Sequence, residues 1–200
     1  MTVFLNKSVI NDLVTMEDVL QVVENAFVEL HQGSVKLPQR EKITLSEKEG
    51  DCFFMPAYLK EADAFGIKIS PFFANNREDY NLPSVIDFIL LLDTNSGYPL
   101  AMMDAHKITA LRTGAVSGIA ANYLAKDNAS SVALIGMGTQ ARTQLEAICA
   151  VRSIKRVVAT SKNPNTHEEF VQEMSERLQV PIEIESSVEK AVKYSDIILL

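Results

Sequence analysis

The stretch Val132-Ala133-Leu134-Ile135-Gly136-Met137-Gly138-Thr139-Gln140-Ala141 decides the fold. Its four leading apolar residues predict a short buried strand, and a helix is expected over Gln140–Val151. The glycine segment between them fits the pattern G-x-G-x-x-A, in which the glycines allow a tight turn and close approach of a diphosphate. The N–H groups at the start of the helix would face that anion. We therefore predict a dinucleotide site with four cofactor-binding residues: Gly136, Gly138, Thr139 and Gln140. The alternative is a tight turn that serves another ligand.

Beyond the glycine segment, apolar strands and amphipathic helices alternate. Such alternation predicts a parallel sheet with right-handed crossovers, a Rossmann-type doubly wound domain over residues 127–200. Because a buried parallel strand is normally covered by a following helix, we expect this domain to be incomplete at Leu200. The expected elements are strands at Arg156–Thr160, Ile182–Glu185 and Asp196–Leu200, and helices at His167–Leu178 and Val188–Lys193.

The end of the second expected strand bears on the choice of cofactor. A site that prefers NAD usually places an acidic residue there for the ribose 2′-hydroxyl, but the sequence reads Thr160-Ser161-Lys162-Asn163. Ser161 and Lys162 could hold a 2′-phosphate, with Arg142 as a helper. The pattern favours NADP over NAD, although Lys162 could equally be a solvated loop residue.

The first part of the chain shows a different order of expected helices and strands. A helix capped by Thr15 and Asp18 is expected to run to Gly33, and a helix rich in small residues is expected over Ile108–Ala125. Its Gly114 and Gly118 indicate tight packing, because glycine inside a helix is otherwise unfavourable. Residues 1–126 are thus predicted to form an α+β domain. Its expected strands are Arg40–Leu45, Cys52–Tyr58, Phe65–Ser70, Ile86–Asp93 and Tyr98–Asp104, the last two joined by a turn at Thr94–Gly97.

Composition narrows the class of protein. The formal net charge is −7 with no local cluster of Lys and Arg, which argues against nucleic-acid binding. No signal peptide is evident, and the most apolar stretch, Val85–Leu92, is too short to cross a bilayer. Cys52 and Cys149 are far apart and show no zinc-site spacing, so no metal is expected. These features indicate a cytoplasmic protein.

Three cationic residues suggest an anionic substrate: Arg40, Lys68 and Arg112. A single Lys or Arg is usually a surface charge. Lys68 and Arg112, however, have neighbours that suggest burial, and a buried cation needs an anionic partner. Arginine can bind a carboxylate through two hydrogen bonds, and a lysine in a partly dry pocket can exchange protons.

The motifs, taken together, resemble those of the ornithine cyclodeaminase/mu-crystallin family along the whole chain. The matching segments are Leu37-Pro38 with Arg40, Met55-Pro56-Ala57-Tyr58, Gly66-Ile67-Lys68, Asn95-Ser96-Gly97-Tyr98-Pro99, Ala110-Leu111-Arg112-Thr113-Gly114-Ala115 and the glycine segment. The resemblance implies a homodimer joined through the first domain and an amino-acid or imino-acid substrate. It implies that Arg40 and Arg112 bind the substrate carboxylate and that Lys68 polarises or protonates the reacting centre. Ser84, Arg112 and Thr113 would contact the cofactor.

The resemblance leaves several activities open. Our first hypothesis is an ornithine cyclodeaminase that recycles bound NAD(P) to convert L-ornithine to L-proline and ammonia, using an aspartate expected beyond Leu200. The second is an alanine dehydrogenase or cyclic ketimine reductase that consumes NAD(P)H. The third is a non-catalytic NADPH-dependent binding protein like the lens member. The sequence departs from the family after Ser84: reductases often have a histidine soon after this position, whereas Val85-Ile86-Asp87 follows here. Asp87 could face a substrate amine or, as we favour, cap a strand end.

Overall fold

The computed structural model describes residues 1–200 and separates them into two compact units. The first unit comprises Met1–Val14 and Asn25–Thr109, and the second comprises Thr15–Glu24 and Ala110–Leu200. Two helices, α2 (Met16–Gln32) and α4 (His106–Leu124), contribute residues to both units. The predicted sequence domains, 1–126 and 127–200, stay a prediction.

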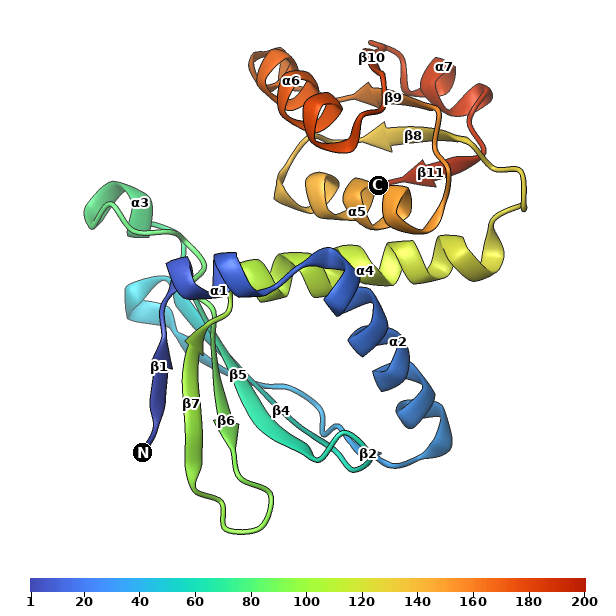
Figure 1. Ribbon diagram of the computed structural model, residues 1–200. Helices are drawn as coiled ribbons and strands as arrows, with labels where there is room; N and C mark the ends of the chain where they lie inside the picture. The colour runs from blue at the N-terminus through green and yellow to red at the C-terminus, as the bar shows by residue number, and fades with distance from the viewer. The chain divides into compact units, whose positions relative to one another are not determined.

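A seven-stranded sheet forms the first unit, with the order β1-β7-β6-β5-β4-β2 and β3 paired to β4 (Figure 1). Only β1 is parallel to its neighbour, β7, and the remaining pairs are antiparallel. The predicted strands are present, but Arg40 precedes its strand by one residue. The bounds are β1 Val3–Leu5, β2 Val35–Lys36, β3 Glu41–Leu45, β4 Gly50–Leu59, β5 Ala64–Phe73, β6 Phe88–Leu92 and β7 Pro99–Asp104.

Local turn chemistry connects these strands as the sequence predicts. In the β6–β7 turn, the Asp93 carboxylate accepts hydrogen bonds from the backbone N–H groups of Asn95 and Ser96, and Gly97 has a φ of 70°. The sequence patterns did not predict β1, α1 (Lys7–Leu13), β2 or α3 (Asn76–Asp79).

Helix α2 begins and ends at predicted residues. The Thr15 hydroxyl accepts the Asp18 N–H at 3.2 Å, and the Thr15 N–H donates to the Asp18 carboxylate at 3.3 Å. Gly33, with a φ of 76°, follows the last residue of the helix. A buried side chain on α2, Glu29, accepts the backbone N–H groups of Glu61 and Ala62, both at 3.1 Å. This contact ties α2 to the β4–β5 turn.

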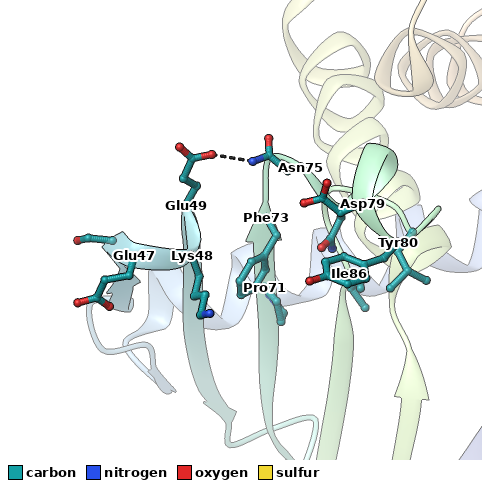
Figure 2. Close-up of a pocket in the computed structure, with 12 residues that line it drawn as sticks. Glu47, Lys48, Glu49, Pro71, Phe73, Asn75, Asp79, Tyr80 and Ile86 are labelled. Atoms are coloured by element: carbon teal, nitrogen blue, oxygen red, sulfur yellow. Dashed lines mark hydrogen bonds between the residues drawn. The ribbon is translucent and has the colours of Figure 1, made fainter.

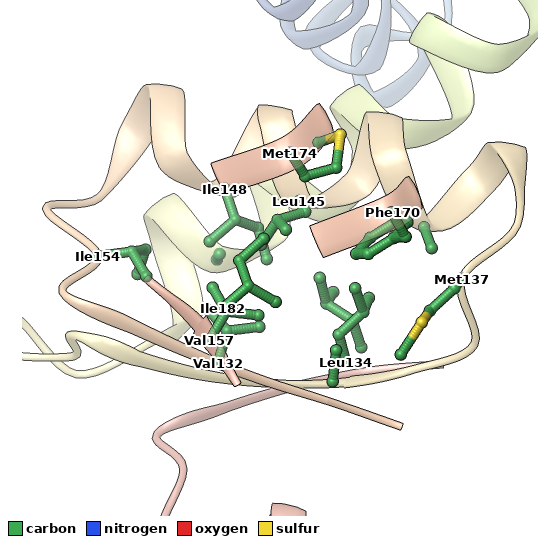
Figure 3. Close-up of a cluster of buried hydrophobic side chains, with 14 residues drawn as sticks. Val132, Leu134, Met137, Leu145, Ile148, Ile154, Val157, Phe170, Met174 and Ile182 are labelled. Atoms are coloured by element: carbon green, nitrogen blue, oxygen red, sulfur yellow. The ribbon is translucent and has the colours of Figure 1, made fainter. Parts of the chain in front are cut away.

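The second unit is a four-stranded parallel sheet with the order β10-β9-β8-β11. Alternate residues of β8 enter different cores. Val132 and Leu134 pack with residues of α5 and α6 (Figure 3). Ala133 packs with Ala191 of α7. Helices therefore cover both faces, which confirms the predicted doubly wound fold. The bounds are β8 Ser131–Ile135, α5 Thr139–Val151, β9 Arg156–Thr160, α6 His167–Leu178, β10 Ile182–Ile184, α7 Val188–Lys193 and β11 Ile197–Leu199.

Two glycines of α4 explain its small-residue composition. A Cβ added at Gly114 would lie 2.5 Å from the carbonyl carbon and oxygen of Thr143 on α5. A Cβ at Gly118 would lie 2.9 Å from the Cβ of Ala147. The predicted tight packing is confirmed: the two helices approach too closely for any side chain at Gly114.

Candidate functional site

The glycine segment forms a tight turn between β8 and α5. Gly136 has a φ of 109°, a conformation that L side chains rarely adopt, and its N–H donates to the Thr160 carbonyl at 2.8 Å. Gly138 caps α5 with extended backbone, and a Cβ added to it would meet no atom within 4 Å. The backbone beside Gly138 is therefore open to an approaching ligand, as the predicted diphosphate site requires.

The strand order places this turn where nucleotides bind in related architectures. In sequence order the strands run third, second, first and fourth, so the direction of winding reverses between β8 and β11. Ligands of open α/β sheets bind beyond the carboxyl ends of strands at such a reversal. Gly136 directly follows β8, and the exposed Thr139 and Gln140 begin α5. Topology and loop geometry thus point to the same location.

Arg142 has a role that the sequence analysis did not predict. Its guanidinium donates to the Met137 carbonyl at 2.9 Å and pairs with Glu173 at 2.7 Å. It also lies over the Phe170 ring, 5.0 Å from the centroid. These contacts brace the glycine segment from α5, and binding a 2′-phosphate, the helper role suggested by the sequence, would require Arg142 to leave them.

The end of β9 carries the residues that the sequence analysis linked to cofactor choice. The Ser161 hydroxyl donates to the Asn163 carbonyl at 3.1 Å and lies 3.1 Å from Nε2 of His167. Lys162 is exposed. His167, which begins α6, is a polar neighbour that the sequence pattern did not reveal, because only the fold brings it to Ser161.

A charged cluster lies in the first unit around Lys68 of β5. The Lys68 ammonium is 3.6 Å from Oδ1 of Asp87 and donates to the Thr109 hydroxyl at 3.4 Å. The Ser70 hydroxyl donates to the same Asp87 oxygen at 2.5 Å. The Lys68 side chain keeps 18% exposure and that of Asp87 keeps 5%. Asp87 directly precedes β6, at a strand end as expected, and its side chain also contacts Lys68 and Ser70.

The other predicted substrate and cofactor residues occupy separate places. Arg40 is exposed and lies over the Phe53 ring, 5.6 Å from the centroid. Ser84 is half-buried, and its carbonyl accepts the Phe73 N–H at 2.9 Å. Arg112 is exposed on the part of α4 that belongs to the second unit, so the expectation that its neighbours bury it is wrong. Thr113, beside it, is half-buried.

A pocket elsewhere in the first unit contains none of the predicted site residues. It is lined by residues 46–49, by Pro71 and Phe73 of β5 and by the segment around α3, and a hydrogen bond of 2.7 Å joins Glu49 to Asn75 at its edge (Figure 2).

No group of three or more His, Cys, Asp or Glu side chains is placed to hold a metal ion. None of the helices has the length and apolar character needed to cross a membrane.

A doubly wound parallel sheet with an open glycine turn at its winding reversal defines the class of Rossmann-type nucleotide-binding proteins. The family model for the ornithine cyclodeaminase/mu-crystallin family matches residues 1–200, and the chain belongs to that family.

Solved and curated proteins similar to this chain have several activities. A Thermococcus litoralis Δ1-pyrroline-2-carboxylate reductase, solved with NADH and L-proline, is 39% identical, has a TM-score of 0.90 and aligns over 98% of this chain and 61% of its own. An archaeal alanine dehydrogenase dimer with bound NAD is 34% identical, with a TM-score of 0.87 over 95% of this chain and 57% of its own. An L-lysine cyclodeaminase of Streptomyces rapamycinicus is 32% identical over 88% of this chain. This chain spans only 52% of that cyclodeaminase.

Proposed function

We propose that the protein is an NAD(P)-dependent oxidoreductase of small α-amino and α-imino acids, and that its reaction is the reduction of Δ1-pyrroline-2-carboxylate to L-proline. The observation that carries this proposal is the Lys68 cluster: an ammonium held by Asp87 and Thr109 yet partly open to a small ligand. The 39% identity to a reductase solved with NADH and L-proline supports the choice of substrate. Because of this similarity, we prefer the reductase to the ornithine cyclodeaminase, which was the first hypothesis from the sequence.

We assign the following roles to residues of the substrate site. Arg40 and Arg112 would bind the substrate carboxylate, since guanidinium groups form paired hydrogen bonds with carboxylates. Lys68 would donate a hydrogen bond or proton at the imine nitrogen, the atom that gains a proton when its carbon gains hydride. Bound NADH or NADPH would supply that hydride. One hydride and one proton convert the cyclic imine to the amine.

Cofactor binding is assigned to the glycine turn. Gly136, Gly138, Thr139 and Gln140 would hold the diphosphate. Ser84 would lie near the nicotinamide, and Thr113 would also contact the cofactor. Ser161 and Lys162 would face the 2′ position, and they suit NADPH as well as NADH because neither is acidic. Gly138→Ala tests this assignment: its Cβ meets no atom of the chain, so stability should be unchanged while cofactor affinity falls. Equal cofactor affinity in this variant would contradict the assignment.

The test of the reaction is an assay of the complete purified protein with Δ1-pyrroline-2-carboxylate and NADH or NADPH. We expect oxidation of the cofactor matched by formation of L-proline. Lys68→Ala should lose turnover and keep cofactor affinity. Cofactor binding without turnover on any imino or keto acid would instead support the non-catalytic binding protein. Pyruvate with ammonia, in the same assay, tests the alanine dehydrogenase activity.

The second candidate is an ornithine cyclodeaminase, favoured by the likeness to the L-lysine cyclodeaminase. In that reaction the cofactor is recycled, so L-ornithine and a trace of NAD⁺ should yield ammonia and proline without accumulation of reduced cofactor. Accumulation of reduced cofactor, or no reaction with ornithine, would contradict it.

We propose a homodimer joined through the first unit. Phe4 of β1 and Met102 of β7 are register partners, and both are exposed in the single chain, Phe4 at 75%. A row of exposed apolar side chains on a sheet is typical of a surface that another chain covers. Light scattering should show a dimer for the complete protein and a monomer for Phe4→Glu; an unchanged dimer in the variant would place the interface elsewhere. A cytoplasmic location stays a prediction.

A further inference from the structure

The Asp87 side chain is more buried than that of Lys68, and neither role that the sequence suggested for Asp87 includes its contact with this lysine. The β5–β6 register pairs Ile69 with Phe88, and the bridge between Phe72 and Val85 continues the same register. This register places Asp87 opposite Ser70. The Ser70–Asp87 hydrogen bond is therefore a direct cross-strand contact.

Lys68 lies two residues before Ser70 on β5, so both side chains leave the same face of the sheet. Asp87 reaches both of them from the neighbouring strand edge. Asp87, just before β6, and Thr109 of α4 both contact the ammonium of Lys68. A lysine side chain with four rotatable bonds is thereby held in one direction.

Electrostatics gives this contact a further consequence. A carboxylate with 5% exposure is unfavourable without a compensating charge, and Lys68 supplies that charge. The attraction is mutual, so the Asp87 carboxylate favours the protonated ammonium of Lys68. The pair also has no net charge, which leaves less attraction for a substrate carboxylate than Lys68 would exert alone.

We propose that Asp87 is a positioning residue: it holds Lys68 protonated and directed toward the substrate, and it tempers the attraction of Lys68 for substrate anions. This inference rests on the proposed function of Lys68. Asp87 would thus neither touch the substrate nor serve only to stabilise the fold.

The test compares Asp87→Asn with Asp51→Asn in the complete protein. Asp51 of β4 also pairs with a lysine, Lys42 of the neighbouring strand β3, at 3.3 Å. The β4–β5 register sets Asp51 opposite Phe72 and Lys68 opposite Met55. Asp87→Asn should lower kcat by about tenfold to a hundredfold, the range expected when a proton donor is misdirected, while KM stays equal or falls. Asp51→Asn should change neither parameter. Asp87→Glu should recover part of the lost kcat.

A second measurement does not depend on turnover. Amine-specific acylation followed by mass spectrometry should label Lys68 faster in Asp87→Asn than in the wild-type protein, because loss of the carboxylate favours the nucleophilic neutral amine. If the wild-type protein shows no turnover but this labelling difference is present, the proposed reaction fails and the positioning role of Asp87 stands.

Other outcomes would overturn the inference. An unchanged kcat, an unchanged labelling rate, or a loss of kcat with a raised KM that Asp87→Glu fails to recover would reduce Asp87 to a structural residue. If Asp87→Asn does not fold, Ser70→Ala provides the test, because it removes the hydrogen bond that orients Asp87 and keeps both charges. It should lower kcat several-fold at unchanged KM, and an unchanged kcat would contradict the proposal.

Discussion

The two sheets of this protein are stabilised in different ways. In the second unit, three consecutive β8 residues, Val132, Ala133 and Leu134, are at most 1% exposed, because helices cover both faces of the sheet. In the first unit, nine of the ten β4 residues are only half-buried. The second unit therefore depends mainly on apolar packing, whereas specific buried polar contacts, such as those of Glu29 and Asp87, carry more weight in the first. The more deeply buried sheet carries the predicted nucleotide turn, and the less buried one carries the charged cluster.

The largest effect should come from Gly114→Ala. Its Cβ would lie 2.5 Å from the backbone of Thr143, which cannot move aside as a flexible side chain can. We expect a loss of about 3 kcal/mol or more in the free energy of unfolding of the second unit, measured by urea denaturation. Gly138→Ala is the matched control, with open space around its Cβ and an expected change near zero. Equal stability of the two variants would refute the close helix contact.

A pair of apolar truncations compares the two cores. Leu134→Ala removes a side chain that is 1% exposed and should cost about 2–5 kcal/mol. Ile43→Ala removes one that is 54% exposed on β3 and should cost less than about 1 kcal/mol. Thermal unfolding of both variants measures the difference. Similar losses would show that another chain or segment buries Ile43 in the assembled protein.

Glu29 tests the dependence of the first unit on buried polar contacts. Glu29→Ala leaves the N–H groups of Glu61 and Ala62 without their carboxylate acceptor and should cost about 1–3 kcal/mol. Glu29→Gln keeps one acceptor oxygen and should cost less. Hydrogen exchange at residues 61 and 62 should accelerate in both variants. Unchanged exchange would mean that the turn is held by its backbone alone.

The smallest effect on stability concerns Cys149 of α5. Burial raises the pKa of its thiol from 9.0 to about 11, because the apolar surroundings disfavour the thiolate. In a Cys52→Ser background, we expect slow alkylation of the folded protein at neutral pH and fast alkylation after unfolding. Since the folded pKa is the higher one, the thiol lowers stability only as pH rises from about 9 toward 11. Rapid alkylation of the folded protein at neutral pH would contradict this burial.

The second unit could be predicted closely because its signals are local. The bounds of β9, α6 and α7 agree with the sequence patterns, since strand and helix periodicity and the glycine turn each lie within a few consecutive residues. The first unit was predicted less completely: β1 pairs in parallel with β7, nearly a hundred residues away, and three apolar residues at the start of a chain do not specify that partner. The role of each candidate site residue, including Lys68, stays a prediction.

By itself, the sequence determined the family, the doubly wound sheet and the glycine turn, because short segments of sequence specify backbone conformation and hydrophobic periodicity. Only the tertiary structure decided that Asp87 meets Lys68, that Arg142 braces the glycine turn and that Arg112 is exposed. Several of these contacts, such as the pairs of Lys68 with Asp87 and of Arg142 with Glu173, join residues from different elements. They depend on strand register and on burial by other elements, which no local pattern encodes.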